Sequence, residues 1–562
     1  MFIPVTSEEV RKRGWDRLDV ILVSGDTYVD SYYNGSAVIG HWLMDNGYRV
    51  GMIAQPDVTS DKDITRLGEP SLFWSISAGC VDSMIANYSA TKKRRKEDDF
   101  TPGGVNDRRP DRACIAYSNL IRKYFKGARI VLGGIEASLR RIAHYDMWSD
   151  SVRRSVLFDA KADIITYGMS ELSNLELADA LRDGTEWKDV RGICYISQDR
   201  KEGYEVIPSF ESCSNDKNAF ISAFTTFYDN CDPHTAKGMV QRHGDRYLIH
   251  NPPSRHLSTE MLDRIYCMEY ENKVHPYHSK DGKVRSMETI KQSVTTHRGC
   301  YGECNFCAIA VHQGRTVISR SEDSVIDEVN RMVRNKGFNG IIYDVGGPTA
   351  NMYRTECLKK VQVGPCKDKR CMFPKICERL SADHGAQISL LERIEGVEGV
   401  KKVFVTSGIR YDLILSDKQN GKRYLDHIVK NNISGQMKIA PEHISDDVVR
   451  LMGKPGRKEL LEFKSMFEAS NKEHGKQQFL TYYLIAAHPG CYEHHMEELR
   501  KFVTHELRTN PEQVQIFTPS PSTFSTMMYH TRRDINNTKD LKAEKSMQMK
   551  QKQKDIVLGV VK

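Results

Sequence analysis

The sequence predicts an α/β protein with two large domains, a doubly wound sheet followed by a partial (βα)6 barrel. The chain has 562 residues, whereas a single hydrophobic core stops growing near about 250–300 residues. Strand and helix patterns alternate in both halves of the chain, which is typical of parallel sheets covered by helices. Of the 14 cysteines, seven fall between Cys300 and Cys377. The second domain is therefore the expected place of a metal-binding or catalytic site.

The doubly wound domain is expected over residues 1–210. We expect its strands at residues 18–24, 48–54, 128–132, 162–167 and 190–196, and its helices at residues 35–47, 111–124 and 171–181. The strand segments are short apolar runs rich in β-branched residues, and the helical segments carry apolar residues at helical spacing. This alternation predicts parallel strands with helices on both faces, and such sheets bind ligands beyond the carboxyl ends of their strands.

The barrel is expected over residues 286–530, after a connector at residues 211–285 that packs on the domains and is not a free linker. We expect strands at residues 290–296, 340–345, 402–407, 435–440, 479–487 and 513–517. Helices are expected after each of the first five strands, at residues 321–335, 387–397, 425–430, 446–452 with 459–473 (both after the fourth strand), and 493–507. Six such units would form an incomplete relative of the eight-unit barrel, open on one side. A cysteine-containing insertion (residues 354–380) interrupts the barrel. The polar tail (residues 531–562) is expected to be a solvated helix or disordered.

The composition is typical of a soluble protein, with 28% charged residues and a mean hydropathy of −0.53. No run approaches the ~18 consecutive apolar residues of a membrane helix, and residues 1–9 lack the pattern of a signal peptide. We therefore expect a cytoplasmic protein with no membrane partner. The net charge of +8 is a weak hint of an anionic partner, and acidic residues 97–99 cancel the basic run at residues 92–96. A nucleic-acid partner is not strongly indicated.

A cysteine motif follows the first expected barrel strand. Cys300-x3-Cys304-x2-Cys307 places three thiols in one loop at the carboxyl end of that strand, where active sites of βα barrels lie. Three thiolates can hold one side of a four-iron cluster and leave one iron open, whereas structural zinc sites and ordinary clusters take four protein ligands. The alternative is a zinc site that takes a fourth ligand from His297 or His312.

With the aromatic Phe306 just before its last cysteine, this motif resembles the signature of the radical S-adenosylmethionine (SAM) superfamily. The resemblance implies a partial βα barrel and a [4Fe-4S] cluster on Cys300, Cys304 and Cys307. It also implies that SAM chelates the open iron through its amino and carboxylate groups. An electron from the reduced cluster would then cleave the sulfonium to a 5′-deoxyadenosyl radical, which abstracts hydrogen from a substrate.

Further segments resemble the YgiQ type of radical enzyme, at residues 101–104, 109–113, 133–141 and 407–412. This type joins a cobalamin-binding-like N-terminal domain to the radical barrel, so the resemblance implies that fold for residues 1–210. Cobalamin domains with a protein ligand carry Asp-x-His-x-x-Gly after the first strand. Here Asp30 and Gly35 match, but Tyr32 replaces the histidine that contacts cobalt. Cobalamin could still bind without that ligand, but we favour a domain that keeps the fold and has lost the cofactor.

The resemblance also extends to residues around the nucleoside ligand. Gly346 and Gly347 follow the second barrel strand, where the superfamily places a Gly-Gly-Glu turn; Pro348 replaces the glutamate, and a plain tight turn is the alternative. Glu442 ends the fourth strand and could contact the ribose or the substrate, or else cap the next helix. Together with Phe306, these residues form the predicted cofactor-binding set.

Four more cysteines lie in the insertion, with the spacing Cys357-x8-Cys366-x4-Cys371-x5-Cys377. Four thiols are sufficient for a zinc ion or an auxiliary cluster, but the segment lacks paired Cys-x2-Cys motifs. We favour a second metal site slightly over a metal-free structural role.

These observations predict a radical SAM enzyme that uses a [4Fe-4S] cluster, SAM and a reductant such as flavodoxin or ferredoxin. Its substrate and catalytic residues are not assigned by the sequence. One alternative is a non-catalytic iron–sulfur protein for electron transfer or sensing, which a fourth cluster ligand would favour. Another is a radical enzyme that modifies RNA, which salt-dependent RNA binding would favour.

Overall fold

The computed structural model describes residues 1–560 and confirms the α/β class, with a large and mainly parallel sheet. The chain divides into two compact units. Unit 1 comprises Met1–His256 and Arg264–Lys291, and unit 2 comprises Leu257–Asp263 and the residues from Gln292 onward. None of the helices within residues 1–560 is both long and apolar enough to cross a membrane.

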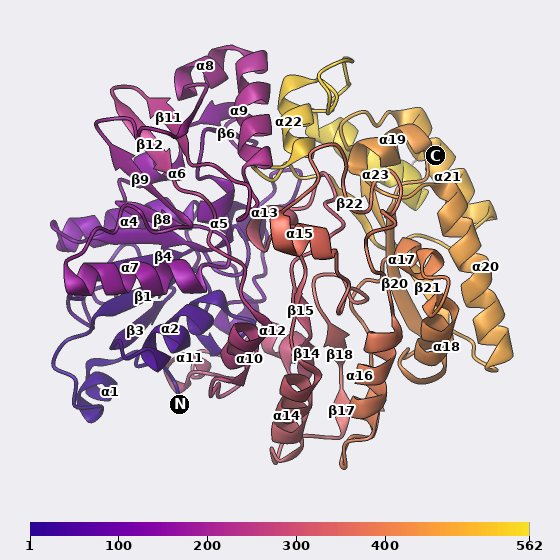
Figure 1. Cartoon of the computed structure of the whole chain (residues 1–562), viewed down its shortest axis with the longest axis horizontal. Helices are drawn as coiled ribbons and strands as arrows, with labels where there is room; N and C mark the ends of the chain where they lie inside the picture. The colour runs from indigo at the N-terminus through magenta and orange to yellow at the C-terminus, as the bar shows by residue number, and fades with distance from the viewer. Residues whose placement is uncertain (561–562) are drawn as a thin grey trace. The chain divides into compact units, whose positions relative to one another are not determined.

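A nine-stranded sheet forms the centre of unit 1 (Figure 1), in the order β10–β11–β12–β9–β8–β5–β4–β1–β3. The strands are β1 (Val20–Ser24), β3 (Val50–Ala54), β4 (Phe73–Ser77), β5 (Ile130–Gly133), β8 (Ile164–Thr166), β9 (Ile193–Ser197), β10 (Glu205–Ile207), β11 (Met239–His243) and β12 (Arg246–His250). Strands β3, β1, β4, β5 and β8 pair in parallel. They are almost entirely buried, as expected of parallel strands covered on both faces.

Helices at two predicted positions connect these parallel strands, but β4 lies in a segment where no strand was expected. α2 (Gly35–Asp45) joins β1 to β3, and α4 (Ala113–Tyr124) joins β4 to β5. The chain thus winds from β1 to β3 in one direction and from β4 through β5 to β8 in the other. The strand order reverses between β1 and β4, which makes their carboxyl ends the switch point where doubly wound sheets bind ligands. The remaining elements of this unit are α1 (Ser7–Lys12), β2 (Val29–Asp30), α3 (Ser83–Asn87), η1 (Pro102–Gly104), α5 (Gly134–Leu139), β6 (His144–Asp146), β7 (Ser151–Arg153), α6 (Val156–Asp159), α7 (Glu171–Asp183), α8 (Phe210–Asn215), α9 (Lys217–Asp229), β13 (Lys273–Val274), α11 (Pro276–Ser279) and α12 (Ser286–Ile290).

Strand β9 differs from the prediction because it runs antiparallel to β8. The N–H of Tyr167 donates to the carbonyl oxygen of Gly192 (2.9 Å), so β9 starts at the carboxyl end of β8. Residues 184–192, between α7 and β9, carry the chain back along the sheet before β9 begins. The fully parallel pairing expected for residues 162–167 and 190–196 is therefore wrong.

The expected connector at residues 211–285 is also wrong, because these residues belong largely to the first unit. Strands β11 and β12 form an antiparallel hairpin that pairs with β9 and β10 and extends the sheet. Polar residues such as Arg242 and His243 lie within these strands, so they do not form the apolar runs that predicted the other strands. Unit 1 therefore continues beyond residue 210 to His256.

Unit 2 contains parallel strands at the six predicted positions. They are β14 (Ser293–Thr295), β17 (Ile341–Ile342) with β18 (Asp344–Gly346), β19 (Lys402–Val403), β20 (Gln436–Glu442), β21 (Phe479–Ala486) and β22 (Val514–Ile516). The parallel pairs are β14–β18, β17–β19, β20–β21 and β21–β22. A parallel bridge from Ile409 to Ile439 joins the segment after β19 to β20. The carboxyl ends of all six strands therefore lie toward one end of the unit.

Helices follow the first five of these strands. They are α14 (Glu322–Val333), α16 (Gly385–Glu395), α18 (Gly421–Asn431), α19 (Asp446–Met452) with α20 (Arg457–Glu473), and α21 (Glu493–His505). Their apolar faces pack with the strands into one core that includes Leu391, Leu425 and Phe463. Shorter elements are β15 (His297–Arg298), α13 (Ile309–His312), β16 (Ile318–Ser319), α15 (Leu358–Val363), α17 (Tyr411–Ser416), α22 (Phe524–Thr531) and α23 (Met547–Leu558). Helix α10 (Thr259–Cys267) begins in unit 2, and its residues from Arg264 onward belong to unit 1.

The polar tail is neither disordered nor simply solvated over its described residues. Helix α23 packs against α21 and β22 (Figure 1). Val557 is fully buried in the core, and Gln553 Oε1 accepts from the N–H of Ala487 (3.0 Å). The buried residues of α23 are Lys550, Gln553 and Val557, and Ile556 and Leu558 pack partly buried against the core. The two buried polar residues explain why its composition predicted solvation. Residues 561–562 lie outside the described residues.

Candidate active site

The three predicted cluster cysteines lie in one loop of unit 2. β15 ends at Arg298, and Cys300, Cys304 and Cys307 follow before α13 begins. Each of these side chains is partly exposed. β14, just before the loop, is the first of the parallel strands, so the loop lies at the carboxyl end of that strand. This is the end at which βα-barrel enzymes place their active sites.

Two glycines shape this loop. Gly299 has a φ of +80°, and a Cβ there would lie 2.0 Å from the carbonyl oxygen of Thr316. Glycine alone combines that left-handed conformation with so close an approach. A Cβ on Gly302 would lie 3.2 Å from Cys300 Sγ and 3.7 Å from Cys304 Sγ. These two thiols therefore face the same small region beside Gly302.

Hydrogen-bond donors lie next to the sulfur atoms. The N–H of Gly302 donates to Cys300 Sγ (3.3 Å), and the Arg410 guanidinium donates to Cys304 Sγ (3.5 Å). Donors of this kind stabilise thiolate ligands and tune a cluster's potential. The sulfurs of the three cysteines, all within the described residues, do not all lie within 4.8 Å of one another, whereas a zinc ion with Zn–S bonds of about 2.3 Å needs sulfurs about 3.8 Å apart. The donors and the spacing fit a polynuclear cluster better than a single zinc ion.

Burial and mutual proximity disfavour the free thiolates. Burial raises the pKa of Cys307 to about 12, and the charges of Cys304 and Cys300 add to the increase. Burial also raises the pKa of Cys300, with Cys304 as the next cause. The three groups therefore interact electrostatically, and ligation by a cationic cluster, which removes the thiol protons, relieves this cost.

The glycine turn after β18 lies against this cysteine loop. Thr349 Oγ1 is 3.5 Å from Cys300 Sγ. A Cβ on Gly347 would lie 2.5 Å from Nε2 of His297, and one on Gly346 would lie 3.1 Å from the Cα of Ala350. Close packing therefore requires glycine in this turn. The predicted glycines lie beside the cysteines, and Thr349, which the sequence did not single out, makes the contact.

Phe306, within the cysteine loop, faces the turn after β21. It packs against the core of unit 2, and its ring centroid is 6.5 Å from that of His488. His488 is in turn fixed by Ser525, whose Oγ lies 2.6 Å from its Nε2. The aromatic residue thus bridges two strand ends that face the same site.

Glu442 lies at the end of β20 in a buried group of charges. Its φ is +67° and its side chain is buried, with Lys454 Nζ 3.7 Å from Oε1. Burial raises the pKa of Glu442 to about 7, although Lys454 and Arg410 oppose this increase. Ser445, at the start of α19, makes no side-chain cap, so nothing supports a capping role for Glu442.

Arg410 connects this charged group to the cysteine loop. Its guanidinium bonds both oxygens of Asp412 (2.8 and 2.6 Å) and also reaches Cys304 Sγ. Both side chains of the pair are buried. The sequence placed residues 407–412 only in a family resemblance, because a spacing pattern does not reveal which strand end lies beside the cysteines.

Glu303, inside the cysteine loop, is a further residue that the sequence analysis missed. Its side chain is buried, and its carboxylate lies 3.1 Å from Lys360 Nζ and 3.7 Å from Arg315 Nη1. Burial raises the pKa of Glu303, but Lys360, Arg315 and Arg370 together lower it below its ordinary value. Lys360 and Arg370 belong to the insertion, so that segment contacts the loop.

Three of the four insertion cysteines gather behind the same loop. Cys357, Cys371 and Cys377 pack in an apolar cluster around Tyr301, and the N–H of Cys377 donates to the carbonyl oxygen of Cys371 (2.8 Å). Within the described insertion, no three of the cysteine sulfurs lie within 4.8 Å of one another. The Sγ of Cys366 instead accepts from Lys359 (3.0 Å).

In unit 1, the carboxyl ends of β1 and β4 are occupied by the chain itself. Arg109 is fully buried there, with its guanidinium 2.8 Å from Asp26 and 3.0 Å from Asp98. It also donates to the carbonyl oxygen of Ala78 (3.1 Å). A Cβ on Gly25 would lie 2.1 Å from that same oxygen. The switch point of this sheet is therefore filled by side chains and backbone.

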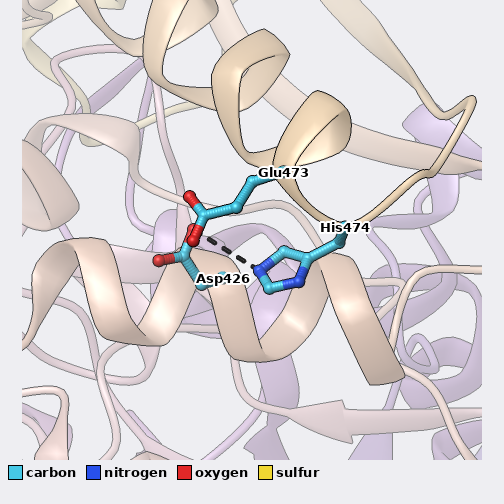
Figure 2. Close-up of side chains that lie close together, drawn as sticks. All are labelled: Asp426, Glu473 and His474. Carbon is cyan, nitrogen blue, oxygen red and sulfur yellow. Dashed lines mark ion pairs between the residues drawn. The ribbon is translucent and has the colours of Figure 1, made fainter.

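One further group has the residue types of a metal site. Asp426 of α18 lies beside Glu473 and His474 at the end of α20 (Figure 2). The ammonium of Lys422 lies 2.6 Å from Asp426 and 3.2 Å from Glu473. The position of a cation between these carboxylates is thus already taken by a lysine.

Comparison with known proteins identifies the family. A UPF0313 protein of Fusobacterium nucleatum is 58% identical over 558 residues, which cover 99% of this chain and 98% of that protein. The chain belongs to the UPF0313 family. A UPF0313 protein of Thermotoga maritima is 46% identical over 562 residues (99% and 98% covered). Residues 2–293 of this UPF0313 chain match the radical SAM N-terminal family model, so it is a member of the radical SAM superfamily of the YgiQ type.

Solved structures share the fold of this UPF0313 protein at low sequence identity. The radical SAM methyltransferase TsrM from Kitasatospora setae, with cobalamin and a [4Fe-4S] cluster bound, matches with a TM-score of 0.50 and 12% identity. That match covers 90% of this chain and 76% of TsrM. The cobalamin-dependent radical enzyme OxsB also matches with a TM-score of 0.50 and 12% identity, covering 92% of this chain and 56% of OxsB.

The geometry at Gly299 gives a prediction for this UPF0313 protein. Gly299→Ala should lose most of the iron bound after anaerobic reconstitution, because its Cβ collides with the Thr316 carbonyl and displaces the cysteine loop. Gly435→Ala is the matched control, because Gly435, just before β20, also has a positive φ (+120°) but has nothing within 4 Å of an added Cβ. Iron per chain measures the effect, and equal iron in both variants would contradict the prediction.

Proposed function

We propose that this protein is a radical SAM enzyme whose cluster is held by Cys300, Cys304 and Cys307. One observation carries the proposal: three interacting thiols, at a strand's carboxyl end, have spacing and donors that fit a cluster with three protein ligands. A reduced cluster of this kind, with one open iron, supplies the electron that cleaves SAM to methionine and a 5′-deoxyadenosyl radical. Flavodoxin or ferredoxin is the class of reductant proposed.

The surrounding residues have proposed roles in binding. Gly346 and Gly347 let the backbone approach the methionine part of SAM beside Cys300, and Phe306 forms an apolar wall. Glu442 faces the ribose or the substrate. With a pKa of about 7, it can accept or donate a proton there.

The first test is formation of 5′-deoxyadenosine by anaerobically reconstituted protein with dithionite and SAM. Cys304→Ala should abolish the product, because the cluster loses one of its three ligands, whereas Cys267→Ala in unit 1 should leave it unchanged. Mass spectrometry measures the product. An intact, reducible cluster whose electron paramagnetic resonance (EPR) spectrum does not change on adding SAM would contradict the proposal.

We also propose that unit 1 retains the cobalamin-binding type of fold without the cofactor. Two features support this. Tyr32 stands at the position of the cobalt ligand and packs against Tyr33 and Tyr266, with ring centroids 4.6 and 4.7 Å away. The buried Arg109–Asp26–Asp98 group fills the switch point, and removing its ion pairs would leave buried charges unpaired, at a cost of about 3–5 kcal/mol.

We predict that the protein retains no corrin after incubation with hydroxocobalamin and gel filtration. Tyr32→His should also retain none, because restoring the ligand does not empty the switch point. Visible absorbance of the protein fraction measures retention. One corrin per wild-type chain would show that the proposal is wrong.

A second metal at the insertion cysteines is a separate proposal. Cys371 lies close enough to Cys357 and Cys377 for their charges to add to the burial that raises its pKa to about 11. The spread of the sulfurs favours a cluster over a single zinc ion. Cys371→Ser should lower the iron or zinc content of the purified protein, as measured by mass spectrometry of metals. Unchanged iron and zinc would refute the second site.

A further inference from the structure

The insertion carries a buried lysine that reaches the cysteine loop from behind. Lys360 is on α15, and only 3% of its surface is exposed. Its Nζ donates to Glu303 Oε1 (3.1 Å) and to the carbonyl oxygen of Arg315 (2.6 Å). The same ammonium lies 5.1 Å from the centroid of the Tyr301 ring. Lys360 therefore contacts residues on both sides of Cys304 in the chain.

A second cation of the insertion holds the other side of the loop. Arg370 Nη1 donates to the carbonyl oxygen of Glu303 (3.2 Å) and to Asn305 Oδ1 (2.5 Å). The amide of Asn305 in turn donates to the carbonyl oxygen of Leu451 (2.8 Å). Backbone and side-chain groups on each side of Cys304 are thus bound by the insertion.

We propose that the insertion is a cationic clamp, in which Lys360 and Arg370 position the cysteine loop and raise the reduction potential of its cluster. This inference rests on the proposed function, because it requires a cluster on Cys300, Cys304 and Cys307. Lys360 acts through Glu303 and is a positioning residue. The clamp role holds whether or not the insertion cysteines bind a metal of their own.

The electrostatic part of the proposal follows from the burial of these charges. Reduction adds an electron to the cluster, so a nearby fixed cation favours the reduced state and a nearby anion disfavours it. Such charges interact strongly because water screens buried groups poorly. Three cations surround the single carboxylate of Glu303, namely Lys360, Arg315 and Arg370. The net charge of this group next to the cysteine loop is therefore positive.

The test uses three variants of the full chain: Lys360→Met, Glu303→Gln and the double variant. Lys360→Met leaves Glu303 without its nearest cation and should shift the cluster potential to more negative values. Glu303→Gln removes the anion and should shift it to more positive values. The double variant removes one charge of each sign and should return close to wild type. A purely structural role would not reverse the sign of the shift.

The second readout is cluster retention. Lys360→Met should transfer iron to a chelator about 10-fold faster than wild type, in the range seen when partners of metal ligands are removed. Lys359→Met is the matched control, since Lys359 is the adjacent lysine on α15 and its Nζ donates to Cys366 Sγ (3.0 Å), just as Lys360 Nζ also lies 3.8 Å from Cys371 Sγ. The potential is followed through the EPR signal that responds to SAM, which separates this cluster from any metal at the insertion cysteines.

Each outcome decides a different statement. A wild-type chain that holds no SAM-responsive cluster overturns the proposed function and this inference with it. A wild-type cluster whose potential and iron transfer equal those of Lys360→Met overturns the clamp alone. If Lys360→Met holds no cluster at all, recovery in the double variant supports the clamp, because Glu303→Gln takes away the buried charge that Lys360→Met leaves unpaired. Failure to recover overturns it.

Discussion

A short loop that carries three thiols has no hydrophobic core of its own. Its conformation must therefore be fixed by contacts with residues from other segments of the chain. In this protein the buried carboxylate of Glu303 meets that requirement. It turns inward between Cys300 and Cys304 and pairs with Lys360 and Arg315. A buried charge without a partner is strongly unfavourable. Because Glu303 is buried, its ion pair with Lys360 therefore holds the insertion against the cysteine loop. The turn at Gly299 belongs to this loop, and Arg410 and the glycine turn after β18 both contact it.

Buried charges also need partners in unit 1, but there the ion pairs close the end of the sheet and do not support an accessible loop. There, Arg109 pairs with Asp26 and Asp98 across the carboxyl ends of β1 and β4. The ion pairs close the place where a doubly wound sheet would hold a ligand. In unit 2 the buried pairs lie beside the strand ends and leave the three thiols partly exposed. Similar chemistry thus stabilises a closed edge in one unit and supports an accessible loop in the other.

The sequence predicted the fold wherever apolar patterns are strong. The six strands of unit 2 and four of the five parallel strands of unit 1 were predicted from short apolar runs, a pattern that burial on both faces produces. The fifth, β4, was missed because its two serines interrupt the apolar run. Strands β11 and β12 were missed because their charged residues lie within the strands, and α23 was read as solvated because its buried face is mostly polar. The direction of β9 depends on the path of residues 184–192, which no periodicity encodes.

The candidate site was predictable to the extent that it is local in the chain. Cys300, Cys304 and Cys307 are consecutive parts of one loop, and their spacing identifies them without tertiary structure. Glu303, by contrast, has no distinguishing pattern in the sequence. Its burial and its contacts with Lys360 and Arg370 appear only in the structure. Arg410 lies more than a hundred residues from Cys304 and meets it through parallel pairing of distant strands.

The family model that matches this chain covers residues 2–293, whereas the thiols and their supporting charges lie in unit 2. The shared N-terminal fold is therefore not the place of the proposed redox chemistry. A closed switch point in unit 1 leaves that chemistry to residues that only unit 2 supplies. Among the cations proposed to tune the cluster, Arg315 and Arg410 come from other segments of unit 2, whereas Lys360 and Arg370 come from the insertion. Because their partners are a buried carboxylate and backbone carbonyls, their effect should appear as a change in potential before it appears as a loss of fold.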